Sequence, residues 1–119
     1  MNVTDTFINI TSEDAERLVA FYHGTVGLPM RPEMGDHSVQ VGCTTLSFDT
    51  HSETRGATKE PSRVIISMLV DDLATEQSRL EALGVKFSRT AGKEFWGGLI
   101  STFSDPDGNL MQLIEFKGE

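Results

Sequence analysis

Apolar and polar residues alternate in several short stretches of the chain, and Gly, Pro or Asp residues separate these stretches. Residues 6–11 alternate in the way a half-buried strand does, and residues 63–70 form a strongly β-prone run. After each of these strands, acidic residues open a segment with apolar positions at helical spacing. Further strands are predicted at 30–33, 37–41 and 44–49, and again at 85–87, 98–103 and 110–116.

The order of one strand, one helix and three strands therefore occurs twice. When the two halves are aligned, Phe7 falls on Ile65 and Asp14 on Asp72, while Gly27 matches Gly84 after a one-residue gap. A repeat of this length is too long for most solenoids and fits two small curved sheets that join into one larger mixed surface, with helices on the outside. The pattern predicts the α+β class.

One domain is expected to span the whole chain, because 119 residues suffice for one hydrophobic core but not for two independent ones. Residues 51–62 contain almost no apolar side chain and are expected to form an exposed connector. The expected organisation is a first module at about 1–50, a linker at 51–62 and a second module at about 63–119.

Charge and cysteine content narrow the partners and the location. Eighteen acidic residues against ten basic ones give a net charge of −8, which repels nucleic acid and anionic membranes. Neither is expected as a partner. Cys43 is the lone cysteine, and residues 1–5 lack the features of a secretory signal. We therefore expect a cytoplasmic location.

Four motifs occur in a characteristic order, and the last of them, Asp105-Pro106-Asp107-Gly108-Asn109, is also a strong turn signal. The others are Ala20-Phe21-Tyr22 with Gly27-Leu28-Pro29, then Val70-Asp71-Asp72-Leu73, then Trp96-Gly97-Gly98. With these motifs the chain resembles the vicinal oxygen chelate superfamily of glyoxalases, bleomycin resistance proteins and extradiol dioxygenases. The resemblance implies two βαβββ modules that form a cleft, usually in a homodimer.

Metal-using members of that superfamily place a ligand in the first and last strand of each module. Carried over residue by residue, these positions fall on Phe7, Ser47, Ile65 and Gln112. Phe and Ile cannot coordinate a cation, so the inherited site is short of ligands and of negative charge. No metal and no cofactor are expected. A shifted site is the rival hypothesis, because Asp49 and His51 share strand parity with Ser47 and could bind an ion.

The same resemblance places a mixed set of side chains on the inner side of the cleft. These are Phe7, Asn9, Ser47, Asp49, Ile65, Ser67 and Gln112, with Trp96 at the border. An apolar floor with a few polar groups suits a small organic ligand. The favoured function is binding of such a molecule in a metal-free cleft. A metal-dependent lyase or dioxygenase with an atypical ligand set, and a closed structural or regulatory module, remain as alternatives.

Overall fold

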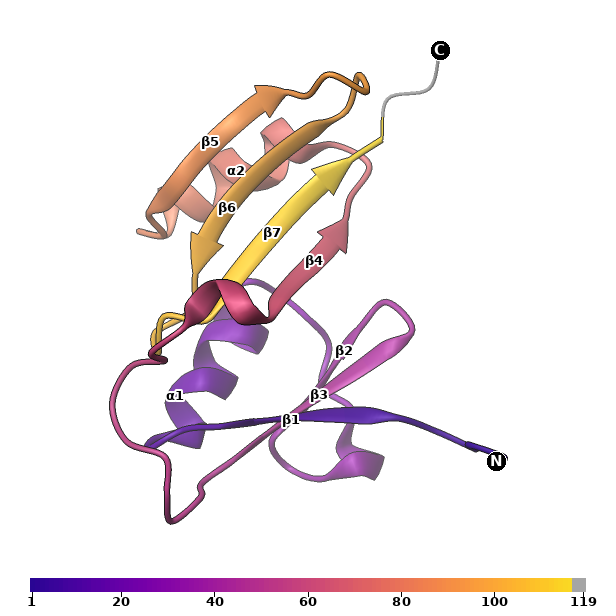
Figure 1. Ribbon diagram of the computed structural model, residues 1–119, viewed down its shortest axis with the longest axis vertical. Helices are drawn as coiled ribbons and strands as arrows, with labels where there is room; N and C mark the ends of the chain where they lie inside the picture. The colour runs from indigo at the N-terminus through magenta and orange to yellow at the C-terminus, as the bar shows by residue number, and fades with distance from the viewer. Residues whose placement is uncertain (117–119) are drawn as a thin grey trace. The chain divides into compact units, whose positions relative to one another are not determined.

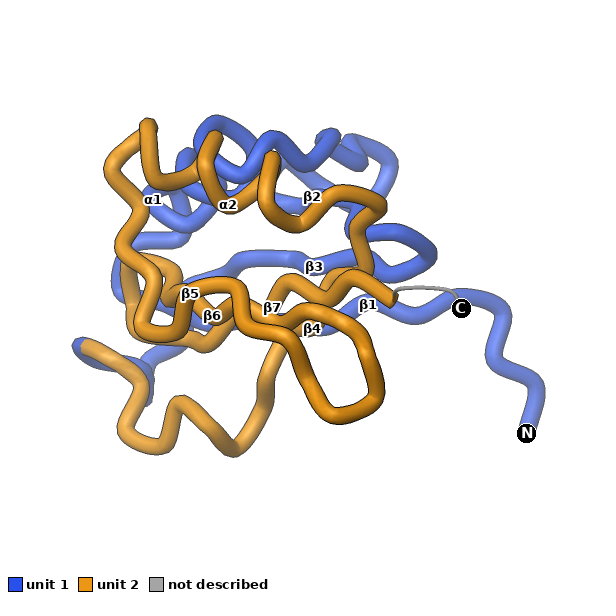
Figure 2. The backbone as a smooth tube through the Cα atoms, turned by 90° about the horizontal axis from the view of Figure 1, so that it is seen from above, with its two compact units in different colours: residues 1–56 blue, residues 57–119 orange. Residues whose placement is uncertain are grey.

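A computed structural model describes residues 1–116 of the chain. The backbone divides into two compact units, residues 1–56 and 57–119 (Figure 2). The division falls within the predicted connector. The last three residues expected in the second module, 117–119, lie outside the described residues.

The first unit contains a three-stranded mixed sheet with the order β1-β3-β2 (Figure 1). Strand β1 (Phe7–Thr11) runs parallel to β3 (Thr44–Asp49), and β2 (Ser38–Val41) runs antiparallel to β3. Helix α1 (Ala15–Val19) follows β1 and continues as a π-helical segment, Ala20–Thr25. The predicted helix therefore exists, but its second half is wound more widely than an α-helix.

The strand predicted at 30–33 is wrong. Met30 forms only an isolated bridge to Val39, and Pro32–Met34 is a 3₁₀ turn. Proline has no N–H to give to a sheet and is well suited to the first turn of a helix, so the chain curls at Pro32 instead of extending. Gly35 then ends the turn with a φ of +117°, a value that favours glycine.

One face of the first sheet packs on the helical segment. Tyr22 stacks on Phe48 with ring centroids 4.7 Å apart, and both side chains are fully buried. Leu18, Leu46 and Val39 complete this core. Because side chains alternate along a strand, burial of Leu46 and Phe48 directs Thr45, Ser47 and Asp49 to the opposite face.

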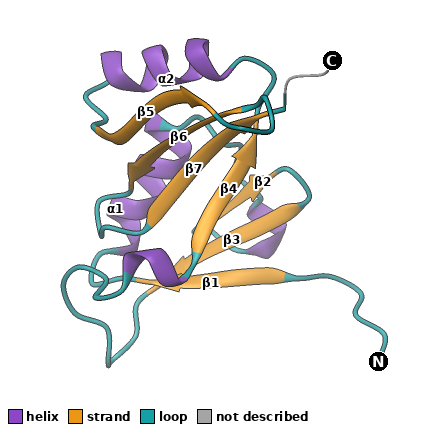
Figure 3. Ribbon diagram, turned by 45° about the horizontal axis from the view of Figure 1, so that its top comes forward, coloured by secondary structure: helices purple, strands orange, loops and turns teal. Residues whose placement is uncertain are grey.

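The second unit contains the full strand-helix-three-strands order in a four-stranded sheet, β4-β7-β6-β5. Helix α2 (Leu73–Ala82) packs along one face of this sheet (Figure 3). The strands are β4 (Ile65–Leu69), β5 (Phe87–Lys93), β6 (Leu99–Ser104) and β7 (Leu110–Glu115). The buried apolar side chains of this unit are Leu73 and Leu80 on α2 and, on the strands, Met68, Phe103, Met111 and Leu113. Strand β5 begins only at Phe87, the last residue of the segment predicted at 85–87, so that prediction was displaced, and register shifts interrupt the pairing of β5 with β6.

The internal repeat is visible in the backbone of the two units. The first strand of each unit pairs in parallel with the last, and Phe7 and Ile65 are equivalent in the two registers. Gly27 and Gly84 have φ values of 91° and 92° at the ends of the two helical segments. The α+β fold class and the repeated order of elements are thus confirmed, with the first unit lacking one strand.

Matching contacts begin both helices. Asp14 and Asp72 are the N-caps, and their side chains accept hydrogen bonds from the backbone N–H of Arg17 and Thr75, at 3.1 and 3.2 Å. The α2 terminus has one more acceptor, because Glu115 is buried and accepts the Leu73 N–H at 2.8 Å. A carboxylate at this position satisfies a backbone donor that the helix itself leaves unpaired.

The turn predicted at 105–109 is confirmed. Asp105 Oδ1 accepts the backbone N–H groups of Asp107 and Asn109, each at 2.9 Å, and Asp105 Oδ2 accepts the Asn109 side-chain amide at 2.8 Å. Gly108 has a φ of 85°, which glycine adopts without strain. This turn fixes the start of β7.

Among the described residues, none of the helices is long and apolar enough to cross a membrane.

Replacement of the α2 cap tests this account of the second unit. Asp72→Ala removes the acceptor for Thr75 and should lower the free energy of unfolding by about 1 kcal/mol. The exposed neighbour Asp71 is the matched control, and Asp71→Ala should change stability by less than about 0.5 kcal/mol. Urea denaturation followed by circular dichroism measures both. Equal losses of stability in the two variants would contradict the assignment of Asp72 as the N-cap of α2.

Candidate functional site

The face of the second sheet opposite α2 is exposed and largely apolar. Ser67 on β4 and Gln112 on β7 are direct partners in the parallel register, and the Gln112 amide donates to Ser67 Oγ at 3.2 Å. The register places apolar side chains on the same face, namely Ile65 and Leu69 on β4, Leu110 and Ile114 on β7, and Ile100 on β6. Ile65 is 42% and Leu69 63% exposed. The same registers add Thr102 and Ser104 of β6 and Arg89 of β5, so the open face is mainly apolar and carries the Gln112–Ser67 pair among a few polar groups.

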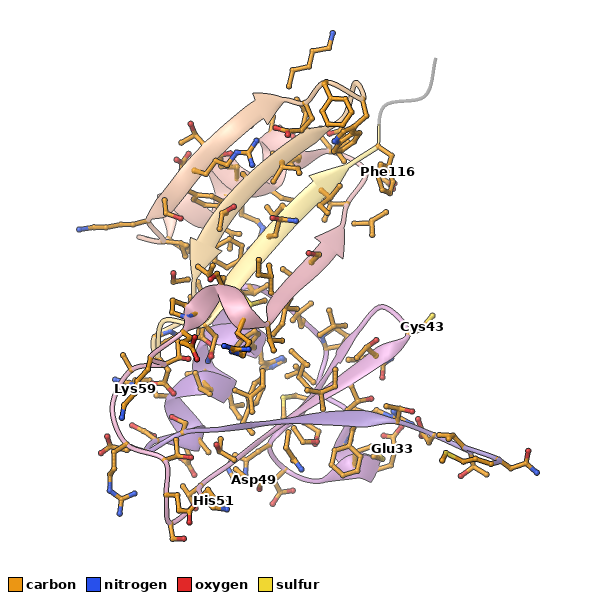
Figure 4. All side chains as sticks on the ribbon, viewed as in Figure 1. Glu33, Cys43, Asp49, His51, Lys59 and Phe116 are labelled. Carbon is orange, nitrogen blue, oxygen red and sulfur yellow. The ribbon has the colours of Figure 1, made fainter. Side chains whose placement is uncertain are left out.

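An aromatic pair marks one end of the open face. Phe116 directly follows β7 (Figure 4) and continues the alternation of Gln112 and Ile114. The rings of Trp96 and Phe116 meet edge to face with centroids 5.5 Å apart. Trp96 also lies over Gly98, since a Cβ atom on Gly98 would be 1.6 Å from Cζ3 of the indole. The glycine in the Trp-Gly-Gly motif therefore provides the space that the indole occupies.

The corresponding face of the first sheet is polar. Thr45, Ser47 and Ser38 are buried on it, and the hydroxyls of Ser38 and Ser47 lie 2.7 Å apart. Phe7 pairs with Thr45 and Asn9 with Ser47, and both Phe7 and Asn9 are exposed. The same strand positions therefore carry hydroxyls and an amide in the first unit and mainly aliphatic groups in the second.

Arg31 is the cation on this polar face. Its side chain is only 21% exposed, and Nη1 donates to Thr45 Oγ1 while Nη2 donates to Asp5 Oδ2 at 2.8 Å. Nε donates to Glu33 at 3.3 Å. The hydrogen bond from Arg31, with one from the Thr6 backbone and the nearby positive charge, lowers the pKa of Asp5. In return, the bond to Asp5 raises the pKa of Arg31 despite partial desolvation.

The predicted site residues fall into two groups, one on each unit. Ile65, Ser67 and Gln112 share the open face of the second sheet, and Trp96 contacts Phe116 at its end. By register, Phe7, Asn9, Ser47 and Asp49 share a face of the first sheet.

The positions that would hold a metal do not fit one. Phe7 and Ile65 have no donor atom, and Gln112 already hydrogen-bonds Ser67. Ser47 is hydrogen-bonded to Ser38. A divalent cation needs several imidazole or carboxylate ligands directed at one point, and these four residues supply neither type.

The alternative pair, Asp49 and His51, lies at the exposed end of β3 (Figure 4). His51 Nδ1 accepts the backbone N–H of Glu53 at 3.1 Å, so one ring nitrogen is already engaged. Over residues 1–116, no three His, Cys, Asp or Glu side chains come together in a way that could hold a metal ion. Two ligands alone do not make a catalytic centre.

Sequence reasoning missed Arg31 and Phe116. In a strand at 30–33, Arg31 and Met30 would lie on opposite faces. The structure also has them on opposite faces, because Met30 bridges Val39 whereas Arg31 contacts Thr45. Its partner Asp5 is 26 positions away in the chain, and nothing in the local pattern connects them. Phe116 was included in a predicted strand without being assigned to the site.

Comparison with known proteins agrees with this architecture. The model of the Glyoxalase/Bleomycin resistance protein/Dioxygenase superfamily matches residues 6–113. The chain therefore belongs to this superfamily. A search of curated proteins gave no significant match.

Solved structures show the same fold at low sequence identity. A superfamily member from Sphaerobacter thermophilus DSM 20745 is 22% identical, with a TM-score of 0.69 over 93% of this chain and 97% of that one. A family enzyme from Burkholderia phytofirmans PsJN is 17% identical, with a TM-score of 0.75 over 94% and 98%. Lactoylglutathione lyase from Agrobacterium tumefaciens is 19% identical, with a TM-score of 0.69 over 97% and 96%.

The packing of Trp96 on Gly98 can be tested directly. Gly98→Ala places a methyl group where the indole lies, so Trp96 should turn into solvent and its fluorescence emission should shift to the red. The cost in stability should be about 1 kcal/mol, because the indole is at the surface and can move.

Gly92→Ala is the matched control for this substitution. Gly92 lies on β5 with its nearest neighbour, the Thr90 carbonyl oxygen, at an ordinary 3.8 Å. The emission of this variant should equal that of the parent protein. An unchanged spectrum for Gly98→Ala would show that Trp96 does not pack on this glycine.

Proposed function

We propose that this protein binds a small organic molecule on the open face of its second sheet and uses no metal ion to do so. One observation carries the proposal: an exposed, mainly apolar face on which the Gln112 amide is hydrogen-bonded to the Ser67 hydroxyl. Ligand sites commonly combine apolar contact area with a few oriented polar groups. The superfamily membership supports the proposal, because two of the four inherited positions, Ile65 and Gln112, fall on this face.

The contacts available suit an uncharged, partly flat ligand. Covering the exposed parts of Ile65 and Leu69 would contribute about 1 kcal/mol each, since burial of a whole aliphatic side chain is worth about 1.5–3 kcal/mol. Gln112 has one more N–H and a carbonyl oxygen to orient a polar group. Trp96 at the end of the face offers an aromatic surface for stacking.

The same face supports binding rather than catalysis. Strands β4, β6 and β7 present aliphatic, hydroxyl and amide side chains to it, and no His, Cys, Asp, Glu or Lys. General acid-base catalysis needs a group that titrates near neutral pH within reach of the substrate. A serine without a neighbouring base is a weak nucleophile.

Two further properties belong to this proposal. The protein acts in the cytoplasm, which a lone, exposed Cys43 supports because cytosolic proteins keep reduced thiols. It also forms a homodimer, and exposed apolar residues such as Val64 and Phe95 give a partner subunit apolar surface to bury.

A screen of uncharged aromatic drugs and α-keto compounds tests the binding function. At least one compound should raise the melting temperature and change Trp96 fluorescence, because a ligand that binds only the folded state stabilises it. Leu69→Ser should raise the Kd of that compound about fivefold, because it removes about 1 kcal/mol of apolar contact. Ser78→Ala, on the exposed surface of α2, is the control and should leave affinity unchanged. A panel without any shift, or equal affinities of the two variants, would count against the proposal.

A further inference from the structure

Arg31 is held firmly in place by its backbone and by the sheet beneath it. Its N–H donates to the Ser38 carbonyl at 2.8 Å, and its neighbour Met30 bridges Val39 on β2. The guanidinium rests on Thr45, whose side chain is completely buried. The cation thus has a fixed position on the polar face of the first sheet.

The two carboxylates that pair with Arg31 are, by contrast, exposed and lie outside the strands. The side chain of Asp5 is 53% exposed and that of Glu33 is 68% exposed. Asp5 belongs to the exposed segment 1–6 that precedes β1, and Glu33 belongs to the 3₁₀ turn. Ion pairs with such exposure contribute little to stability, because water screens them and ordering the side chains costs entropy. A carboxylate from solution would therefore displace Asp5 at low cost.

The surroundings of the guanidinium suit one kind of anion. Phe7, 48% exposed, is on the strand next to Thr45 and is its direct partner in the register. An aromatic ring near a guanidinium offers apolar contact to the body of a ligand, while the guanidinium offers charge-assisted hydrogen bonds to its carboxylate. In a protein with a net charge of −8, attraction of an anion must come from such a local cation.

We propose that the Arg31 guanidinium, held in place by Thr45, forms a binding subsite for the carboxylate of a small aromatic acid, and that Asp5 occupies this subsite when no ligand is present. The subsite lies on the first unit and does not depend on the open face of the second sheet. The Asp5 carboxylate is charged at neutral pH, as an ordinary aspartate is, so it competes with an incoming anion under ordinary conditions.

Benzoate and its neutral analogue benzamide test the proposal with the full-length chain. Titration at constant ionic strength, followed by the NMR signals of the Arg31 Nε–H and the Thr45 amide, should show saturable binding of benzoate only. Asp5→Asn frees the guanidinium and should lower the Kd for benzoate about fivefold, which corresponds to about 1 kcal/mol. Arg31→Gln should abolish saturable binding.

Asp36→Asn is the matched control. Asp36 is exposed and close to Arg31 in sequence, and its replacement changes the net charge by the same amount as Asp5→Asn. The Kd for benzoate should change less than about twofold in this variant, because the screened long-range effect of one charge is small. Arg31→Lys keeps the charge without the planar fork and should bind benzoate more weakly than the parent protein does.

Several results would overturn the proposal. One is an absence of saturable benzoate binding to the Asp5→Asn variant, and another is equal tightening by Asp5→Asn and Asp36→Asn. Equal binding of benzamide and benzoate would also exclude a carboxylate subsite. A protein that binds uncharged compounds on the second sheet but fails these tests would refute the Arg31 subsite and leave the proposed function intact.

Discussion

Parallel pairing between the first and last strands of each unit determines which side chains share a face. In the first unit, the Ser12 N–H donates to the Asp49 carbonyl at 2.9 Å. In the second unit, the Val70 N–H makes the equivalent bond to Ile114 at the same distance. A shift of one residue in either register would move a whole set of side chains to the other face of the sheet. Packing of a helix on one face prevents this shift, because the apolar set must remain buried there.

The two units use this arrangement for different surface chemistry. Ser47 and Gln112 occupy equivalent places on the last strand, and Phe7 and Ile65 occupy equivalent places on the first. In the first unit, the neighbours of Phe7 and Ser47 on this face are mainly hydroxyl groups and Arg31. In the second unit, the neighbours of Ile65 and Gln112 are mainly aliphatic side chains. One backbone repeat therefore carries a polar face and an apolar face, and neither face has the imidazoles or carboxylates that a metal site would need at these positions.

Much of the fold was predictable because its signals are local. The acidic residues at the helix starts, the glycines that end the helices and the turn at 105–109 are each local features, and alternation puts Ile65 and Ser67 on one face of β4. The strand predicted at 30–33 was wrong because a segment that precedes a glycine turn was taken as a strand, whereas Pro32 favours a 3₁₀ turn. The Arg31–Asp5 pair and the contact of Trp96 with Phe116 join residues far apart in the chain, and local patterns do not reveal such contacts.

Metal content is the most direct test of a binding function without a metal ion. The protein is incubated with Mn²⁺, Ni²⁺ and Zn²⁺, separated from free ions by gel filtration and then measured by elemental mass spectrometry. The account predicts less than one ion per chain for each metal, because Phe7 and Ile65 supply no ligand atom. One tightly held divalent ion per chain that is lost in Gln112→Ala would contradict it.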